Sequence, residues 1–75
     1  MTVSRTQVIE RLREAGFTFK TKAKHAELYR KRGGVERVFV NLRDQFDEQM
    51  VVVTLFQAGL TRQQVNAFLA SCVKS

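Results

Sequence analysis

Apolar residues near the start of the chain recur at the spacing of a helix. Ser4 and Gln7 have the spacing of an N-terminal capping box, in which each side chain bonds to the backbone of the other. Gly16 is well suited to end the helix, because glycine adopts the left-handed conformation of a C-cap without steric cost. The apolar stripe between these signals consists of Val8, Ile9, Leu12 and Ala15. We therefore predict a first helix that ends at Gly16.

The end of the chain carries a second set of helix signals. Thr61 and Gln64 again have capping-box spacing. The apolar stripe that follows consists of Val65, Phe68, Leu69 and Cys72. This pattern predicts a final helix that starts near Thr61.

Between these helices the apolar period changes to two, which is typical of strands with one buried face. Phe17, Phe19 and Thr21 alternate with lysines, and a second strand is expected over residues 25–30. The pair Gly33-Gly34 is the turn signal of a hairpin, and a third strand follows around Val38 and Val40. Residues 43–48 form a polar connection after it.

The register of this hairpin depends on its loop. If Arg32 joins the two glycines in a three-residue loop, Leu28 faces Val38; a two-residue loop instead places Leu28 opposite Phe39. With Leu28 directed inward, the outward positions alternate rings with polar and charged groups. These outward positions are His25, Glu27, Tyr29, Arg37, Phe39 and Asn41.

The segment from Met50 to Phe56 is ambiguous. Its β-branched residues favour a strand, whereas Gly59 resembles a helix C-cap and Val51 and Leu55 have helical spacing. In the helical case Val52, Val53 and Phe56 remain outside the core and form a candidate surface for a partner protein or a second copy of the chain; in the other case they are core residues of a buried strand.

The length of 75 residues predicts a single domain over residues 1–75. One cysteine cannot form an internal disulfide, and no Cys/His group has zinc spacing, so we expect a cytoplasmic protein without metal or cofactor. The longest apolar run, Met50 to Val53, is too short to span a bilayer, and no membrane partner is expected.

The net charge of +6 makes a polyanion the first candidate partner. Most of the excess lies between residues 20 and 37, where seven basic residues face only Glu27 and Glu36. Cations interleaved with rings can grip phosphates and stack on bases; the alternative is a solvated strand face whose lysines prevent edge aggregation. The candidate nucleic-acid-binding residues are Lys20, Lys22, Lys24, Tyr29, Arg30, Lys31, Arg32, Arg37 and Phe39.

A DNA-binding alternative uses the end of the chain. Gly59 could lie in the turn of a helix-turn-helix, with Arg62, Gln63 and Gln64 opening a recognition helix. The same pattern fits an ordinary pair of helices.

Four stretches, in this order, resemble the HicA family of small toxins: residues 8–17, 28–30, 37–40 and 55–61, the last containing Ala58-Gly59-Leu60-Thr61. The resemblance implies an α+β fold like that of double-stranded-RNA-binding domains. In this fold a three-stranded antiparallel sheet packs on two helices, here followed by a short C-terminal helical extension. It also implies that residues 49–58 are helical, that RNA is the ligand and that a HicB-like antitoxin is a partner.

The same resemblance implies a metal-independent ribonuclease whose catalytic histidine begins the second strand. His25 is the only histidine, but in the ungapped match Ala26 occupies the catalytic position and His25 stands one residue earlier. A bulge near Ala23-Lys24 would bring His25 back into place. Without it, we expect a protein that binds RNA but cuts it poorly or not at all.

Overall fold

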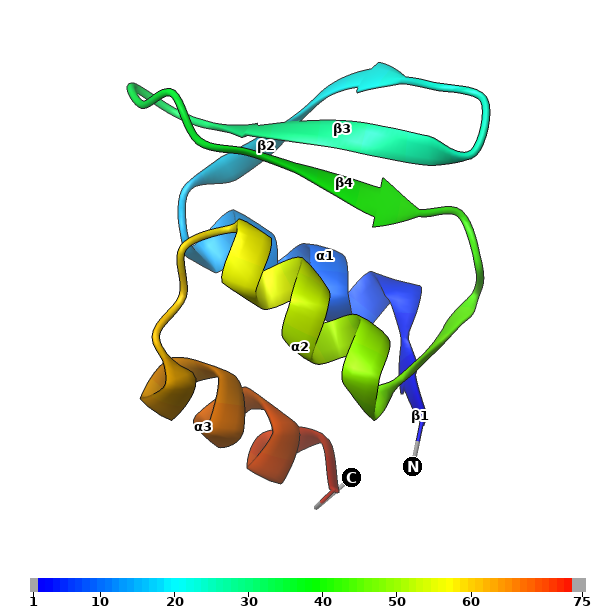
Figure 1. Ribbon diagram of the computed structural model, residues 1–75, viewed down its shortest axis with the longest axis vertical. Coiled ribbons are helices and arrows are strands. Elements are labelled where there is room, and N and C mark those ends of the chain that lie inside the picture. The colour runs from blue at the N-terminus through cyan, green and yellow to red at the C-terminus, as the bar shows by residue number, and fades with distance from the viewer. Residues whose placement is uncertain (1, 74–75) are drawn as a thin grey trace.

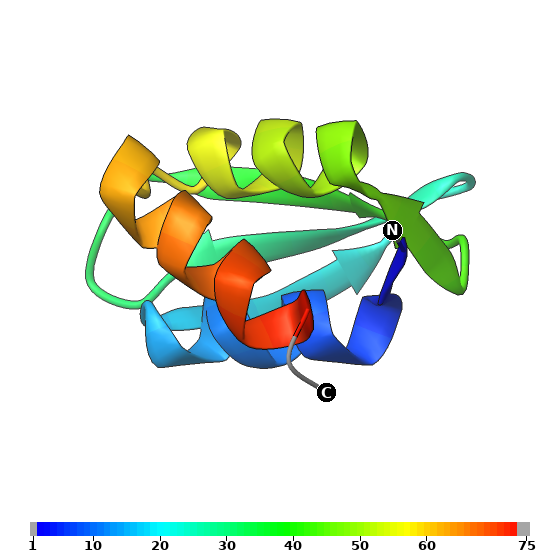
Figure 2. The same ribbon diagram turned by 90° about the horizontal axis from the view of Figure 1, so that it is seen from below.

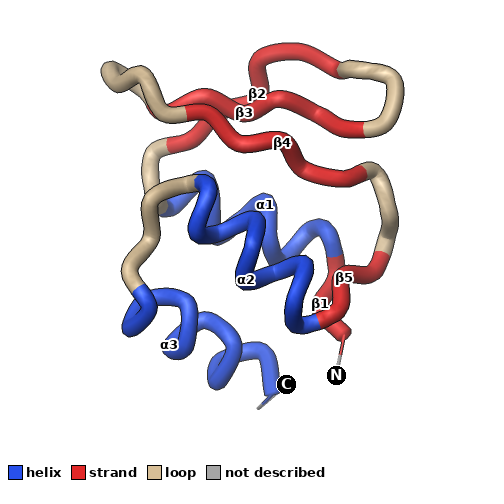
Figure 3. Tube along the Cα trace, viewed as in Figure 1, coloured by secondary structure: helices blue, strands red, loops and turns tan. Residues whose placement is uncertain are grey.

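The computed structural model describes residues 2–73 and contains three helices and two small antiparallel sheets (Figures 1 and 3). The α+β fold class and the three-stranded antiparallel sheet predicted from the sequence are confirmed. In chain order the elements are β1 (Thr2–Ser4), α1 (Arg5–Glu14), β2 (Phe17–Lys22), β3 (Ala26–Lys31), β4 (Arg37–Asn41), β5 (Gln45–Asp47), α2 (Glu48–Gln57) and α3 (Arg62–Val73).

The elements form three layers. The larger sheet has the strand order β2-β3-β4, and α1 and α2 cover one of its faces (Figure 1). Helix α3 crosses beneath these two helices, on the side away from the sheet (Figure 2). The opposite face of the sheet carries no other element of the described chain (Figure 1). Within residues 2–73 no helix is long and apolar enough to cross a membrane.

The helix ends agree with their sequence signals. The Ser4 hydroxyl accepts a hydrogen bond from the Gln7 backbone N–H, and the Gln7 Oε1 accepts one from the Ser4 backbone N–H, which completes the predicted capping box. Gly16 and Gly59 follow α1 and α2 with φ of 94° and 83°, values that favour glycine. Helix α2 covers the ambiguous segment, so its helical interpretation is correct.

One feature near α2 was not predicted. The segment expected to be a polar connection contains β5, which pairs with β1 so that Val3 lies opposite Phe46, and both side chains are fully buried. The final helix predicted from Thr61 is confirmed as α3, which buries Val65 and Leu69 of the predicted stripe; it is longer than α1 or α2 and so is not a short extension.

The β3–β4 hairpin does not have the register in which Leu28 faces Val38, but the alternative in which Leu28 faces Phe39. Leu28 lies opposite Phe39 and Tyr29 opposite Val38, because the loop spans residues 32–35 rather than three residues. Tyr29 is therefore 3% exposed and faces the helices, together with Val38 and Val40. The assumption that Leu28 faces inward is wrong.

A β-bulge interrupts the other strand pair. Phe19 lies opposite Tyr29 and Thr21 opposite Leu28, so the register shifts at Lys20. The bulge that we considered near Ala23-Lys24 lies here instead. Because it changes the faces of the residues that follow, Lys22 shares the helix side of the sheet with Glu27.

Arg5 ties the start of α1 to the underside of the sheet. Its guanidinium forms an ion pair with Glu27 of β3, and its Nε donates to the backbone oxygen of Asn41 in β4 at 3.0 Å. The Tyr29 hydroxyl donates to the same Glu27 carboxylate at 3.3 Å. Arg5 and Glu27 are both mostly shielded from solvent. Removing one of the two charges would therefore leave the other shielded and without a charged partner.

This arrangement predicts that Glu27→Gln destabilises the protein more than Glu36→Gln. Both changes remove one negative charge, but only the first leaves the shielded Arg5 without its charged partner. We expect a loss of about 1–3 kcal/mol for Glu27→Gln and less than about 0.5 kcal/mol for Glu36→Gln, measured by urea unfolding. Equal losses would contradict a structural role for the pair.

Candidate nucleic-acid interface

The uncovered face of the β2-β3-β4 sheet carries the candidate interface. Because residues opposite each other in an antiparallel pair share a face, the register assigns its members. Arg30 and Arg37 lie directly opposite each other, next to Thr18. The full set on this face is Thr18, Thr21, Ala26, Leu28, Arg30, Arg37, Phe39 and Asn41.

The basic surface continues at the end of the sheet where α1 meets the hairpin loop. A shallow groove of about 400 Å³ is lined by Arg13, Thr18, Phe19 and Arg32, among others. Arg13 was not among the candidate residues predicted from the sequence. No sequence pattern marks Arg13, because a tertiary contact places it there: the Arg32 backbone N–H donates to the Gly16 oxygen at 2.8 Å and holds the hairpin loop beside the end of α1.

The cations of this region lack acidic partners within the described chain. The ion pairs among residues 2–73 are Arg5–Glu27 and Arg11–Glu14. None of the seven basic residues from Lys20 to Arg37 therefore forms an ion pair with a described residue. Glu27, the only acid in β3, faces the helices and is paired with Arg5. The uncovered face therefore keeps the full positive charge of Arg30 and Arg37.

The aromatic part of the candidate set changes. Tyr29 was predicted to stack on bases, but it is buried on the helix side and cannot reach a ligand on the open face. Phe39 is 55% exposed on the open face, as predicted. Phe19 is 51% exposed at the edge of the sheet, with its ring edge-on to Tyr29 at a centroid distance of 5.8 Å.

The lysines of the candidate set do not lie on one side of a single strand, as a regular alternation would require. Lys20 occupies the bulge, Lys22 is in register with Glu27, and Lys24 lies in the turn between β2 and β3 (Figure 3). Lys31 ends β3. All four are exposed, but they do not form one row beside Arg30 and Arg37.

His25 also lies in the β2–β3 turn and not in a strand, which corrects the predicted strand start. It is exposed and makes no hydrogen bond to another residue of the described chain. The expectation that it shares a strand face with Glu27 is wrong, because Glu27 points toward Arg5. No side chain therefore orients the imidazole for proton transfer.

The candidate partner surface on α2 is reduced to two residues. Val53 and Phe56 are 49% and 42% exposed. Val52 is half-buried and packs against the core, so it contributes less to a surface than predicted.

The start of α3 has little in common with a DNA-recognition helix. Arg62 and Gln63 are exposed, but Gln64 is engaged in its own cap: its Oε1 accepts from the Thr61 backbone at 2.8 Å, and its backbone donates to the Thr61 hydroxyl at 3.2 Å. This confirms the predicted capping box. It leaves Arg62 as the one charged side chain that α3 contributes among the described residues.

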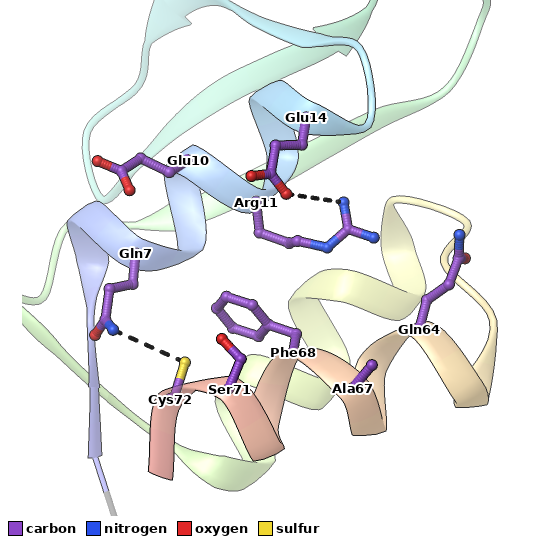
Figure 4. A pocket seen from close by; sticks show the side chains of 9 residues that line it. All are labelled: Gln7, Glu10, Arg11, Glu14, Gln64, Ala67, Phe68, Ser71 and Cys72. Carbon is purple, nitrogen blue, oxygen red and sulfur yellow. Dashed lines mark hydrogen bonds and ion pairs between the residues drawn. The ribbon is translucent and has the colours of Figure 1, made fainter. Parts of the chain in front are cut away.

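A further groove of about 410 Å³ separates α1 from α3 (Figure 4). Phe68 points from α3 toward α1, and Arg11 forms an ion pair with Glu14 across 3.8 Å at its rim. Gln7 donates to the Cys72 sulfur at 3.9 Å, and burial raises the pKa of the Cys72 thiol above its ordinary value. A raised pKa lowers the fraction of reactive thiolate at neutral pH.

No group of three or more His, Cys, Asp or Glu side chains within residues 2–73 is placed to hold a metal ion.

Comparison with known proteins assigns no family. No protein-family model matches the chain, and no curated protein is significantly similar to it.

The position of Tyr29 predicts a loss of stability in alkali. Burial, followed by the negative charge of Glu27, raises the pKa of Tyr29 above its ordinary value of about 10. The unfolded chain therefore loses the phenolic proton first, and stability present below pH ~10 falls as the pH rises through the folded pKa.

Urea unfolding at a series of pH values between about 9 and 11 measures this effect. Tyr29→Phe should flatten the decline, because phenylalanine has no proton to lose. Tyr29 is the only tyrosine, so tyrosinate absorbance follows its titration without interference. The same decline in both proteins would assign the effect to other groups.

Proposed function

We propose that this protein binds single-stranded RNA on the uncovered face of the β2-β3-β4 sheet. The observation that carries the proposal is the placement of Arg30 directly opposite Arg37 on a face from which the only β3 acid, Glu27, is turned away. Two adjacent guanidinium groups without acidic partners suit the phosphates of a nucleic-acid backbone.

Exposed rings support a single-stranded ligand. Phe39 lies on the same face as the arginine pair. Phe19, opposite Tyr29, lies on the other side of β2, in the edge groove that Arg13 and Arg32 also line, so a strand that passes around this edge could reach it. Bases stack on such rings only where they are not already stacked within a duplex. Rings flanked by cations therefore favour an unpaired strand over a double helix.

The resemblance to the HicA family supports RNA rather than DNA as the ligand. The order of α1, three antiparallel strands and α2 is compatible with the double-stranded-RNA-binding-domain-like fold of that family. A HicB-like antitoxin and a cytoplasmic location are parts of the same proposal. The DNA-binding alternative is weaker, because Gln64 is held in its cap and Arg62 stands without a second cation on α3.

Within this proposal the protein binds RNA without efficient cleavage. His25 is in a turn, without a hydrogen-bond partner in the described chain, and the shift of register lies at Lys20 and not beside the histidine. A general acid or base typically contributes about 10²–10⁴-fold to a rate, but only when it is held within reach of the reacting proton.

The binding surface is tested by a double substitution, Arg30→Gln with Arg37→Gln. A matched control removes two exposed cations elsewhere, through Arg43→Gln with Arg62→Gln. We expect only the first pair to weaken binding of an unstructured RNA. The slope of log affinity against log salt should fall by up to about 0.7 for each lost phosphate contact.

Equal weakening by both double variants would show that net charge alone drives binding. If only the control pair lost affinity, with duplex DNA preferred over RNA, the α3 alternative would replace this proposal. Fluorescence anisotropy at several salt concentrations distinguishes these outcomes.

Cleavage is tested by comparing the wild-type protein with His25→Ala. Both proteins, purified without a partner, are incubated with a long unstructured RNA and also induced in growing cells. We expect neither to cut the RNA above background or to arrest growth, while both bind it. Cleavage by the wild type that disappears in His25→Ala would establish a ribonuclease of the HicA kind.

A further inference from the structure

The two edge strands of the larger sheet are built differently. Strand β2 carries a bulge at Lys20 and a second lysine at Lys22, and both features are known to prevent an edge from pairing with another chain. Strand β4 has an unbroken register with β3 from Arg37 to Asn41, with no bulge, lysine or proline. Only the β4 edge is left open to pairing.

The backbone groups on that edge follow from the hydrogen-bond pattern. Lys31 donates to the Glu36 oxygen at 3.0 Å, in the same register as the Tyr29–Val38 pair. Because hydrogen-bonded pairs alternate along an antiparallel ladder, Val38 and Val40 bond to β3. The backbone groups of Arg37, Phe39 and Asn41 therefore face outward, and of these the Asn41 oxygen accepts from Arg5.

A groove of mixed polar and apolar character lies beside this edge. It has a volume of about 370 Å³ between β4 and α2, with Phe39, Met50 and Val53 as its apolar lining and Asn41, Asp47, Gln49, Thr54 and Gln57 as its polar and charged lining. Val53 and Phe56 are exposed on α2, which lies along the β4 side of the sheet (Figure 2). A strand added to β4 would direct alternate side chains onto these residues.

The lining of the groove is not positively charged, unlike the chain as a whole. The groove contains one charged residue, Asp47, and the only charged residue of α2 is Glu48. Neither lysine nor arginine lines the groove, although the chain has a net charge of +6. The groove therefore offers a carboxylate to a cation of a second copy.

We propose that two copies of this chain associate through antiparallel pairing of their β4 strands about a two-fold axis at Phe39. In this register each Phe39 lies opposite the Phe39 of the second copy, and their outward N–H and C=O groups bond to each other. Arg37 lies opposite Asn41 of the second copy, so no like charges meet.

The same register is complementary in charge and in apolar surface. Asn41 and Asp47 line one groove, so Arg37 of one copy approaches the carboxylate of the other at each end of the pairing. Val53 and Phe56 of the two α2 helices face each other beneath the joined strands. The two larger sheets become one, and their uncovered faces form a continuous surface.

The first test is the mass in solution without nucleic acid. Sedimentation equilibrium should show the wild type rising from 8.6 kDa to twice that mass with concentration. Val53→Asp should weaken association at least tenfold. The matched control is Val35→Asp, the same change at an apolar residue exposed in the hairpin loop, and it should leave the dissociation constant within twofold.

The second test fixes the register by cross-linking in a Cys72→Ser background. Opposite residues in a hydrogen-bonded pair have Cα atoms about 5.5 Å apart, which a disulfide can bridge. Phe39→Cys should therefore form a linked dimer under oxidised glutathione. Arg37→Cys should not, because two residue-37 positions would lie about 14 Å apart along the strands.

A wild type that stays at 8.6 kDa throughout would overturn the proposal. So would equal loss of association in Val53→Asp and Val35→Asp, or equal cross-linking at positions 37 and 39. None of these measurements contains RNA, so their failure leaves the RNA proposal standing, and a failure to bind RNA leaves the dimer standing.

Discussion

The burial of one side of the larger sheet determines which residues reach solvent on the other side. A strand alternates its side chains, so burying Tyr29 against the helices places Glu27 on the same side, where it pairs with Arg5, and turns Leu28 and Arg30 to solvent. The hydrogen bond from Tyr29 to Glu27 joins two residues of that side. Once β3 is oriented, its register with β4 brings Arg37 beside Arg30 and Phe39 beside Leu28. The contacts beneath the sheet thus set the chemistry of the face above it.

This coupling separates the charges that pair beneath the sheet from the unpaired arginines on its open face. The carboxylate that could have neutralised the open face is used beneath the sheet, where it holds α1 in place. The aromatic residue that could have stacked on a ligand is used in the core, and Phe19 and Phe39 remain outside. Asp47 has a further structural role. Its side chain accepts a hydrogen bond from the Met50 backbone at 2.8 Å and caps the start of α2.

The sequence was sufficient where a structural signal is local. Capping residues located α1 and α3, glycines located the helix ends, and the Gly-Gly pair located the hairpin. Helix α2 required the family resemblance, because its β-branched residues favour a strand. The sequence allowed two hairpin registers, and the structure has the one with Leu28 opposite Phe39. The choice between them depends on which side of β3 and β4 the helices bury, which local signals do not specify. The bulge at Lys20 and the β1–β5 pair also depend on tertiary contacts. For this reason the predicted regular alternation of lysines along β2 and the predicted exposure of Tyr29 were wrong.

The pairing of β1 with β5 has a consequence for the order in which the protein folds. It joins Val3 to Phe46, near opposite ends of the segment that contains α1 and the whole larger sheet. Closing so long a loop carries a larger entropic cost than pairing neighbouring strands. The β2-β3-β4 meander, made of short connections, gains its contacts at a lower entropic cost, so we expect the N-terminal strand to join after the sheet has formed. Closure of the chain's own beginning onto its middle is then a late step in folding.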